Sequence, residues 1–332
     1  MFATVTVHNC ITGGTKSVHL PVSTSYPAPA YYPKDKGRHV PSSWGRKKPS
    51  LSHGNLEVTL LERKSEGRIG VVYRAHVEKA TTGEGVDITS SLPATVCLKF
   101  AKQHHCRSLA REAWFYEQLH QWQGITIPSY YGFYASTINE QGLRMDDFQP
   151  WNDLETPSVT GSEFDEDPEL ANEYRSMDWL RDDAPYMLDH YSPSKYRNRS
   201  RWFKWNFDKE NPKIALIILE YLGQSGAEVW PPNKPGDDFK SDILDILDDV
   251  GGDGLCHADV TAWNLLQYTG PETDERRCHQ HGIVHKWRLI DFDRSSMLDM
   301  ANTGRNGLYT RGVDKKCVGH PLAFWRRRSG DL

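Results

Sequence analysis

His257-Ala-Asp-Val-Thr-Ala-Trp-Asn-Leu-Leu266 is the stretch of sequence that decides the fold. It places Asp259 five residues before Asn264 and ends in two leucines typical of a short buried strand. A loop aspartate can accept a hydroxyl proton and orient a nucleophile, while an asparagine carbonyl can coordinate Mg²⁺. A turn rich in Asp and Asn is the alternative. The apolar periodicity that predicts a helix at 240–250, together with the two leucines, favours a functional loop.

A second carboxylate motif follows at Leu289-Ile-Asp-Phe-Asp293. Asp291 comes directly after the apolar run at 287–290, which predicts a short strand. Mg²⁺ is usually held by one or two carboxylates together with phosphate oxygens. The motif is therefore typical of a metal ligand, and a simple strand-terminal turn is the alternative.

Two further features lie upstream. Gly67 and Gly70 stand between the strands predicted at 56–61 and 71–75, where glycines let a backbone approach phosphates closely. Lys99 lies on the strand predicted at 95–100, and Glu112 lies on a predicted helix near 107–121. A buried lysine requires a partner, so a salt bridge between the two side chains is expected. Each feature alone is common in proteins.

In this order, the four features resemble the protein-kinase-like superfamily. Val96-Cys-Leu-Lys99 is similar to the V-A-I-K motif, and Glu112 matches the glutamate of its partner helix. Residues 257–264 are similar to H-R-D-x-x-x-x-N, and residues 291–293 stand where D-F-G stands. The resemblance covers about residues 56–295 without residues 136–212. The sequence also resembles fungal kinase-like proteins and the aminoglycoside and choline kinases.

The resemblance implies an α+β, two-lobe fold. We expect a flexible arm at 1–50, an N-lobe at 51–222 with an acidic insertion at 136–212, and a shortened helical C-lobe at 223–332. The N-lobe should contain a five-stranded antiparallel sheet from about 56 to 222, with strands at 130–134 and 214–222 completing it.

The resemblance also implies ATP and Mg²⁺ as cofactors and assigns roles to individual residues. The expected catalytic residues are Asp259, Asn264, Lys99 and Glu112. The expected metal ligands are Asn264 and Asp291. The expected nucleotide contacts are Gly67, Gly70, Val72, Cys97, Lys99 and, at the hinge beside adenine, Glu220 and Leu222.

Several departures from the family pattern leave the function open. Ala258 replaces the arginine of H-R-D, Thr261 replaces a lysine typical of Ser/Thr kinases, and Asp293 replaces the glycine of D-F-G. The leading hypothesis is transfer of the γ-phosphate to a hydroxyl acceptor, with protein Ser or Thr as one option. A small-molecule kinase is favoured by Thr261 and Asp293. A pseudokinase-type ATP-binding interaction module is favoured by the few residues after 293.

Charge and hydropathy limit the classes of partner that the protein is expected to bind. The 332 residues carry a formal net charge of −4, so nothing global indicates nucleic acid or a membrane surface. No apolar run reaches the ~18–20 residues of a membrane span. The insertion is acidic at 146–189 and basic at 195–204. A solvated charged surface explains this pattern, and a docking surface for a protein partner is the alternative.

The six cysteines form no C-x-x-C pair, which predicts reduced thiols and a cytoplasmic or nuclear protein. Cys278-His-Gln-His281, followed by His285, looks like part of a metal site. A zinc site needs about four ligands, and no second cluster in the sequence completes this one. The tract is therefore predicted to be a solvated loop, with a metal site as the alternative.

Overall fold

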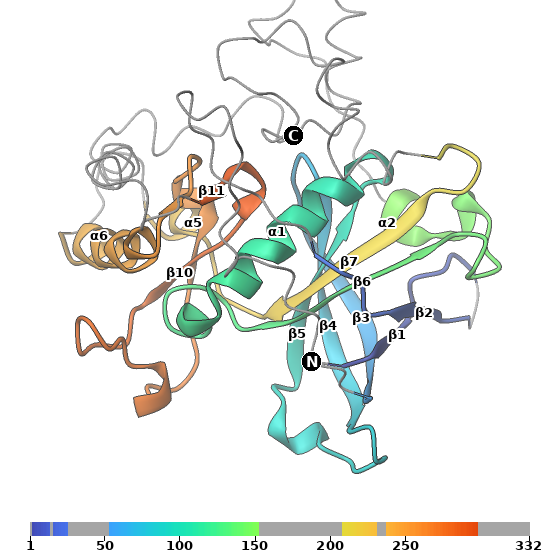
Figure 1. Ribbon diagram of the computed structural model, residues 1–332, viewed down its shortest axis with the longest axis horizontal. Coiled ribbons are helices and arrows are strands. Elements are labelled where there is room, and N and C mark those ends of the chain that lie inside the picture. Colours follow the sequence, from blue (N-terminus) through green and yellow to red (C-terminus); the bar gives the residue numbers. More distant parts are fainter. Residues whose placement is uncertain (1, 14–15, 26–52, 153–207, 231–236, 298–332) are drawn as a thin grey trace, which may run out of the picture.

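A large, mostly antiparallel sheet with few helices forms the core of the protein (Figure 1). The computed structural model describes residues 2–13, 16–25, 53–152, 208–230 and 237–297. The strands are β1 (Thr4–His8), β2 (Val18–Pro21), β3 (Asn55–Glu66), β4 (Gly70–Thr81), β5 (Thr95–Ala101), β6 (Tyr130–Thr137), β7 (Lys213–Glu220), β8 (Leu255–Cys256), β9 (Leu265–Gln267), β10 (Trp287–Leu289) and β11 (Ser296–Met297). The helices are α1 (Cys106–Gln118), α2 (Gln149–Asn152), α5 (Gly226–Val229) and α6 (Asp237–Gly252). The predicted α+β class is confirmed.

Seven strands form the main sheet, in the order β2-β1-β3-β4-β5-β7-β6. Strands β3 to β7 pair antiparallel, as expected, whereas β1 pairs with β3 in parallel. Two small antiparallel pairs, β9 with β10 and β8 with β11, lie outside this sheet. The expected five strands are therefore present within a larger sheet.

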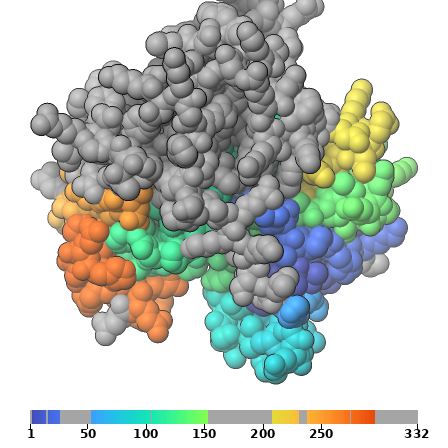
Figure 2. All heavy atoms as spheres, in the orientation of Figure 1, coloured from blue at the N-terminus to red at the C-terminus, as the bar shows by residue number. Residues whose placement is uncertain are grey.

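The main sheet curls until its two edges meet. Val22, directly after β2, forms an antiparallel bridge with Tyr134 of β6. The amide of Ser23 donates to the carbonyl of Phe133, 2.8 Å away. In Figure 2, the N-terminal strands (blue) lie beside the green segment that contains β6 and the residues after it. Joining the edges removes unpaired strand groups that would otherwise be exposed.

Alternation along β7 divides the core into two clusters. Ile214, Leu216 and Ile218 point into the curled sheet. Ala215, Ile217 and Leu219 point the other way, toward α1, α6 and β10. Both faces of β7 are thus buried, which explains why its sequence is a continuous apolar run rather than an alternating one.

Helix α1 lies across the outer face of the sheet (Figure 1), and its residues 106–116 are all buried. The segment contains no Gly or Pro and is rich in good helix formers. Helix α6 packs Ile243, Ile246, Leu247 and Val250 into the same cluster as α1. Among the described residues, no helix combines the length and apolar character that a membrane crossing needs.

Two of the expected boundaries are wrong. The predicted flexible arm at 1–50 contains β1 and β2, which belong to the sheet, while residues 26–52 lie outside the described residues. The predicted insertion begins too early at 136, because β6 runs to Thr137 and residues 138–152 pack against the sheet. Residues 153–207, with most of the charged tract, also lie outside the described residues.

Phe148 and Trp151 show why residues 138–152 belong to the folded unit. The Phe148 ring meets Phe100 of β5 edge-on at 5.6 Å between centroids. The Trp151 indole N–H donates to the carbonyl of Ala101 at 3.0 Å. These aromatic groups close one end of the cluster inside the curled sheet.

We therefore expect Phe148→Ala to lower the free energy of unfolding by about 3–5 kcal/mol, because it deletes a fully buried ring. Urea unfolding measures the change. Met145→Ala, three residues away and exposed, is the matched control and should cost less than about 0.5 kcal/mol. Equal effects of the two substitutions would show that this segment is not part of the core.

Candidate functional site

A buried ammonium between two carboxylates is the centre of the candidate site. Lys99 Nζ on β5 donates to Glu112 Oε2 of α1 and to Asp291 Oδ1, at 2.7 Å in each case. The Glu112 side chain is 1% exposed, whereas that of Asp291 is 30% exposed. The expected contact between Lys99 and Glu112 is confirmed, and Asp291 joins it.

The pKa values of this cluster reflect burial and mutual attraction. Burial alone would lower the pKa of Lys99, but Asp291 and Glu112 outweigh it and hold the pKa well above its ordinary value. Burial raises the pKa of the Glu112 carboxyl to about 8, against the pull of the Lys99 ammonium. We take Glu112 as ionised, because it accepts a short hydrogen bond from a charged donor. One cation then serves two anions, leaving a net negative site.

Residues 257–264 and the segment before Asp291 are held together through Ile290. The carbonyl of Ile290 lies 2.9 Å from His257 Nε2, and its amide donates to the carbonyl of Asn264 at 3.0 Å. His257 Nδ1 accepts from the amide of Asp259 at 3.3 Å, which assigns the ring proton to Nε2. The two predicted motifs are therefore adjacent in space.

Ala258 and Asp291 both adopt left-handed backbone conformations, with φ of 61° and 67°. Such values are uncommon for residues other than glycine and cost on the order of 1–3 kcal/mol each. Strain of this kind persists only where surrounding contacts enforce it. Its presence in both motifs marks this region as a functional candidate.

The amide of Asn264 is oriented by the loop itself. Its Nδ2 donates to the carbonyl of Asp259 at 2.9 Å, which leaves Oδ1 as the outward acceptor. The carboxylate of Asp259 is partly buried, and its Oδ2 lies 3.8 Å from Arg294 Nε. Asn264 therefore offers a neutral oxygen ligand, and Asp259 offers a carboxylate in an ion pair.

The hairpin between β3 and β4 carries the predicted glycines. The amide of Gly67 donates to the carbonyl of Gly70 at 2.9 Å. A Cβ at Gly70 would lie 2.5 Å from the carbonyl oxygen of Phe100, so only glycine fits there, whereas the space around Gly67 is open. Between them, the guanidinium of Arg68 forms an ion pair with the buried carboxylate of Asp293. The hairpin is thus attached to the segment after Asp291.

Val72 and Cys97 lie on the same sheet face as Lys99. Val72 is the direct partner of Lys99 across the ladder, and Cys97 lies two residues before it. The five cysteines of the described residues are all free thiols, as expected.

The two hinge residues are held by contacts within the protein. Leu222 is buried. The carboxylate of Glu220 accepts from the amide of Ser129 and pairs with Arg276 at 3.2 Å, and its amide donates to the carbonyl of Ser129. A contact from Glu220 to a ligand would therefore have to come from its carbonyl oxygen.

Sequence reasoning missed the arginines around the site. The fully buried guanidinium of Arg111 on α1 donates to the carbonyls of Asp293 and Ser295, at 2.9 and 2.6 Å. Arg68 and Arg294 contact Asp293 and Asp259. Their partners lie far away in the sequence, so the only available signal was the departure of Asp293 from the family pattern.

No family model and no curated protein matches the sequence. Among solved structures, the chain is similar to one described as "Structure of vaccinia related kinase 3", with 12% identity and a TM-score of 0.32. The match covers 72% of this chain and 48% of that one, so the chain spans about half the length of the solved protein.

We expect Lys99→Met to destabilise the fold by about 3–5 kcal/mol, because it leaves the buried Glu112 carboxylate without its cation. Adding Glu112→Gln should recover at least about 1 kcal/mol, which a double-mutant cycle by urea unfolding would measure. Lys79→Met, at an exposed position of β4, is the control for loss of a lysine. If the effects of Lys99→Met and Glu112→Gln on the free energy of unfolding simply add, the two side chains are not an energetically coupled buried pair.

Proposed function

We propose that this protein has a kinase-like two-lobe fold, binds Mg-ATP and transfers the γ-phosphate to a hydroxyl acceptor. The observation that carries the proposal is the Lys99 ammonium, held 2.7 Å from both Glu112 and Asp291. Phosphoryl transfer relies mainly on positioning and on stabilisation of charge. A rigid lysine beside a partly exposed carboxylate suits both requirements.

Lys99 would contact the nucleotide phosphates. Its side chain is fixed by Glu112 from the buried side, so the ammonium is oriented before any ligand arrives. Backbone amides of the hairpin at 67–70 and the face carrying Val72 and Cys97 would complete the nucleotide site. Preorganised donors favour binding, because little side-chain entropy is lost when the ligand binds.

Asp291 and Asn264 fit a magnesium ion. Mg²⁺ prefers oxygen ligands, typically one or two carboxylates with phosphate oxygens and water. Asp291 offers a carboxylate, and Asn264 offers its Oδ1, the atom left open by the hydrogen bond of Nδ2. Lys99 is shared by two carboxylates, so Asp291 is not neutralised by a cation of its own. Held by Asp291 and Asn264, Mg²⁺ would supply positive charge that stabilises the phosphates.

Asp259 would orient the acceptor and take its proton. As the acceptor oxygen bonds to the γ-phosphorus, the bond from that phosphorus to the β–γ bridging oxygen breaks and ADP leaves. The hydroxyl proton passes to the Asp259 carboxylate, which is accordingly not a metal ligand in this scheme. The loop geometry set by His257 and Asn264 supports this position.

One observation favours a second candidate, a nucleotide-binding interaction module without turnover. Arg294 Nε lies 3.8 Å from Asp259 Oδ2, so the carboxylate assigned as proton acceptor is already engaged by a cation. Asp293, in place of glycine, is likewise engaged by Arg68. In such a module, these two ion pairs would hold the nucleotide site in the conformation that binds the ligand, and Asp259 would have no part in phosphate transfer.

The metal assignment predicts that Asp291→Ala weakens Mg-ATP binding by about 1.5–3 kcal/mol, roughly a 10- to 150-fold rise in Kd. Calorimetric titration with ATP, with and without Mg²⁺, measures the effect. The wild type should bind more tightly with Mg²⁺, and the variant should lose that difference. Glu78→Ala, at an exposed position of β4, is the control. A wild type that binds no nucleotide would end both candidates.

The chemical assignment predicts that Asp259→Asn binds Mg-ATP within about twofold of wild type but transfers phosphate ~10²- to 10⁴-fold more slowly. Transfer of labelled γ-phosphate to protein hydroxyls and to amino-sugar or choline acceptors measures turnover. Arg294→Gln is the companion variant, and faster transfer by it would identify the ion pair as a restraint. If wild type transfers no faster than Asp259→Asn, the interaction module replaces the enzyme.

A further inference from the structure

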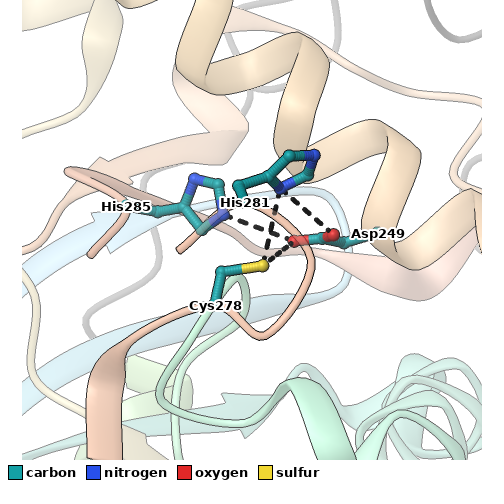
Figure 3. A group of neighbouring side chains, drawn as sticks. All are labelled: Asp249, Cys278, His281 and His285. Atoms are coloured by element: carbon teal, nitrogen blue, oxygen red, sulfur yellow. Dashed lines mark hydrogen bonds and ion pairs between the residues drawn. The ribbon is translucent and has the colours of Figure 1, made fainter. Parts of the chain in front are cut away.

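Four side chains with metal-binding atoms converge beside α6, away from Lys99. Asp249 comes from α6, and Cys278, His281 and His285 come from the connection that leads into β10. Figure 3 shows all four pointing toward one another. One ligand atom from each lies within 4.8 Å of those of the other three. Asp249, Cys278 and His285 are fully buried, and His281 is 24% exposed. The tract is a loop with His279 and Gln280 exposed, as predicted, but Cys278 and His285 are buried, so the predicted solvation is wrong for these two residues.

Four contacts within the cluster, which together involve both oxygens of Asp249, are close to the spacing of donor atoms around one small ion. Cys278 Sγ lies 3.2 Å from Asp249 Oδ2 and 3.5 Å from His281 Nδ1. His281 Nδ1 lies 3.4 Å from Asp249 Oδ1, and His285 Nε2 lies 3.3 Å from Asp249 Oδ2. Tetrahedral zinc with bonds of ~2.0–2.3 Å places its ligand atoms roughly 3.3–3.6 Å apart.

In each histidine, the ring nitrogen that does not face the centre of the cluster lies near a carboxylate of α6, the helix that also carries Asp249. His285 Nδ1 contacts Asp242, whose other oxygen accepts from the amide of Lys286 at 2.8 Å. His281 Nε2 lies 3.8 Å from Asp245. A histidine that binds metal almost always gives its second nitrogen to a carboxylate, carbonyl or water, which fixes its orientation. The carboxylates that contact the two histidines all lie on one face of α6, because Asp242, Asp245 and Asp249 are spaced i, i+3 and i+7.

Two buried atoms inside the cluster are only loosely paired. Within the part of the chain that the structure describes, Asp249 Oδ1 and His285 Nε2 have the ion-pair contacts at 3.4 and 3.3 Å and no well-formed hydrogen bond. Burying a polar atom without a good partner costs roughly 1–3 kcal/mol in protein data, and an ion is one of the partners that offsets this cost. The Cys278 sulfur also accepts from the amide of Gln280 at 3.4 Å.

We propose that Asp249, Cys278, His281 and His285 bind one zinc ion at a structural site. The mixture of one sulfur, two imidazole nitrogens and one carboxylate suits Zn²⁺ and does not suit Mg²⁺ or Ca²⁺, which take oxygen ligands. Four protein ligands close the coordination sphere, as in structural rather than catalytic zinc sites. The tight turn at Gly282, with φ of 68°, brings Cys278 and His281 to the same side.

The zinc ion would fasten together the two segments that lead into the candidate site. Helix α6 continues through β8 into the loop with Asp259, and the connection continues through β10 to Asp291. Zinc joins the helix and the connection upstream of both carboxylates. Its role is therefore to position these segments, without contact with the nucleotide.

The experiment uses the full-length protein, purified, equilibrated with excess ZnCl₂ and dialysed against metal-free buffer. Elemental analysis should give about one zinc per chain in wild type and less than about 0.2 in Cys278→Ser. His279→Gln, an exposed neighbour inside the same tract, is the matched control and should keep its zinc. Chelation should lower the Tm of wild type by ~5 °C or more and leave that of Cys278→Ser unchanged.

Cobalt replacement in wild type keeps the test independent of whether a variant folds. Co²⁺ should give the intense visible bands of tetrahedral coordination and a thiolate charge-transfer band in the near ultraviolet. Both should vanish on titration with Zn²⁺. Wild type that retains no zinc, cobalt without a thiolate band, or equal zinc loss in His279→Gln and Cys278→Ser would each overturn the site. The cluster would then be a network of ion pairs alone.

Discussion

The ammonium of Lys99, held between Glu112 and Asp291, is the interaction on which the rest of the structure depends. It joins β5, α1 and the segment after β10, and its link to Asp291 spans 192 residues. A lysine on a buried sheet face is tolerated only when it is paired, because an uncompensated charge there costs several kcal/mol. The helix and the distant segment must therefore both dock for β5 to be stable. The same arrangement leaves one carboxylate partly exposed and one negative charge in excess, which is the property that the proposed function uses.

Contacts around Asp291 enforce a backbone conformation that this residue would rarely adopt without them. Asp291 has a left-handed conformation, and Phe292 beside it is fixed by edge-on contact with Tyr116 of α1 at 5.0 Å between centroids. The Phe292 ring also meets the His257 ring at 5.3 Å, so helix, loop and strand end share one aromatic contact. Arg111 then holds the carbonyls that follow. The strain is thus offset by packing on one side and by a buried guanidinium on the other.

Local patterns in the sequence were enough to predict β3 to β7, α1 and α6, because alternation and apolar runs reflect burial of one or both sheet faces. The pairing of Lys99 with Glu112 also followed, since a lysine amid apolar residues needs a partner. The sequence did not reveal β1 and β2, which are four or five residues long and pair with strands far along the chain. It did not reveal Asp249 either, because acids spaced along a helix are usually a solvated face, and nothing in the sequence turns that face toward Cys278.

The position of Asp249 adds an electrostatic argument about that face. It lies in the last turn of α6, which ends at Gly252, where the helix dipole disfavours an anion. Asp245 stands four residues before it, and like charges at this spacing repel each other. Full burial makes both penalties larger, since solvent cannot screen them. A divalent cation bound by Asp249 and Cys278 would offset this charge at the point where it is concentrated. The two proposed sites differ in the donor atoms that they collect: carboxylate and amide oxygens around Asp291, and sulfur and imidazole nitrogens around Cys278. The proposals therefore assign a different metal to each.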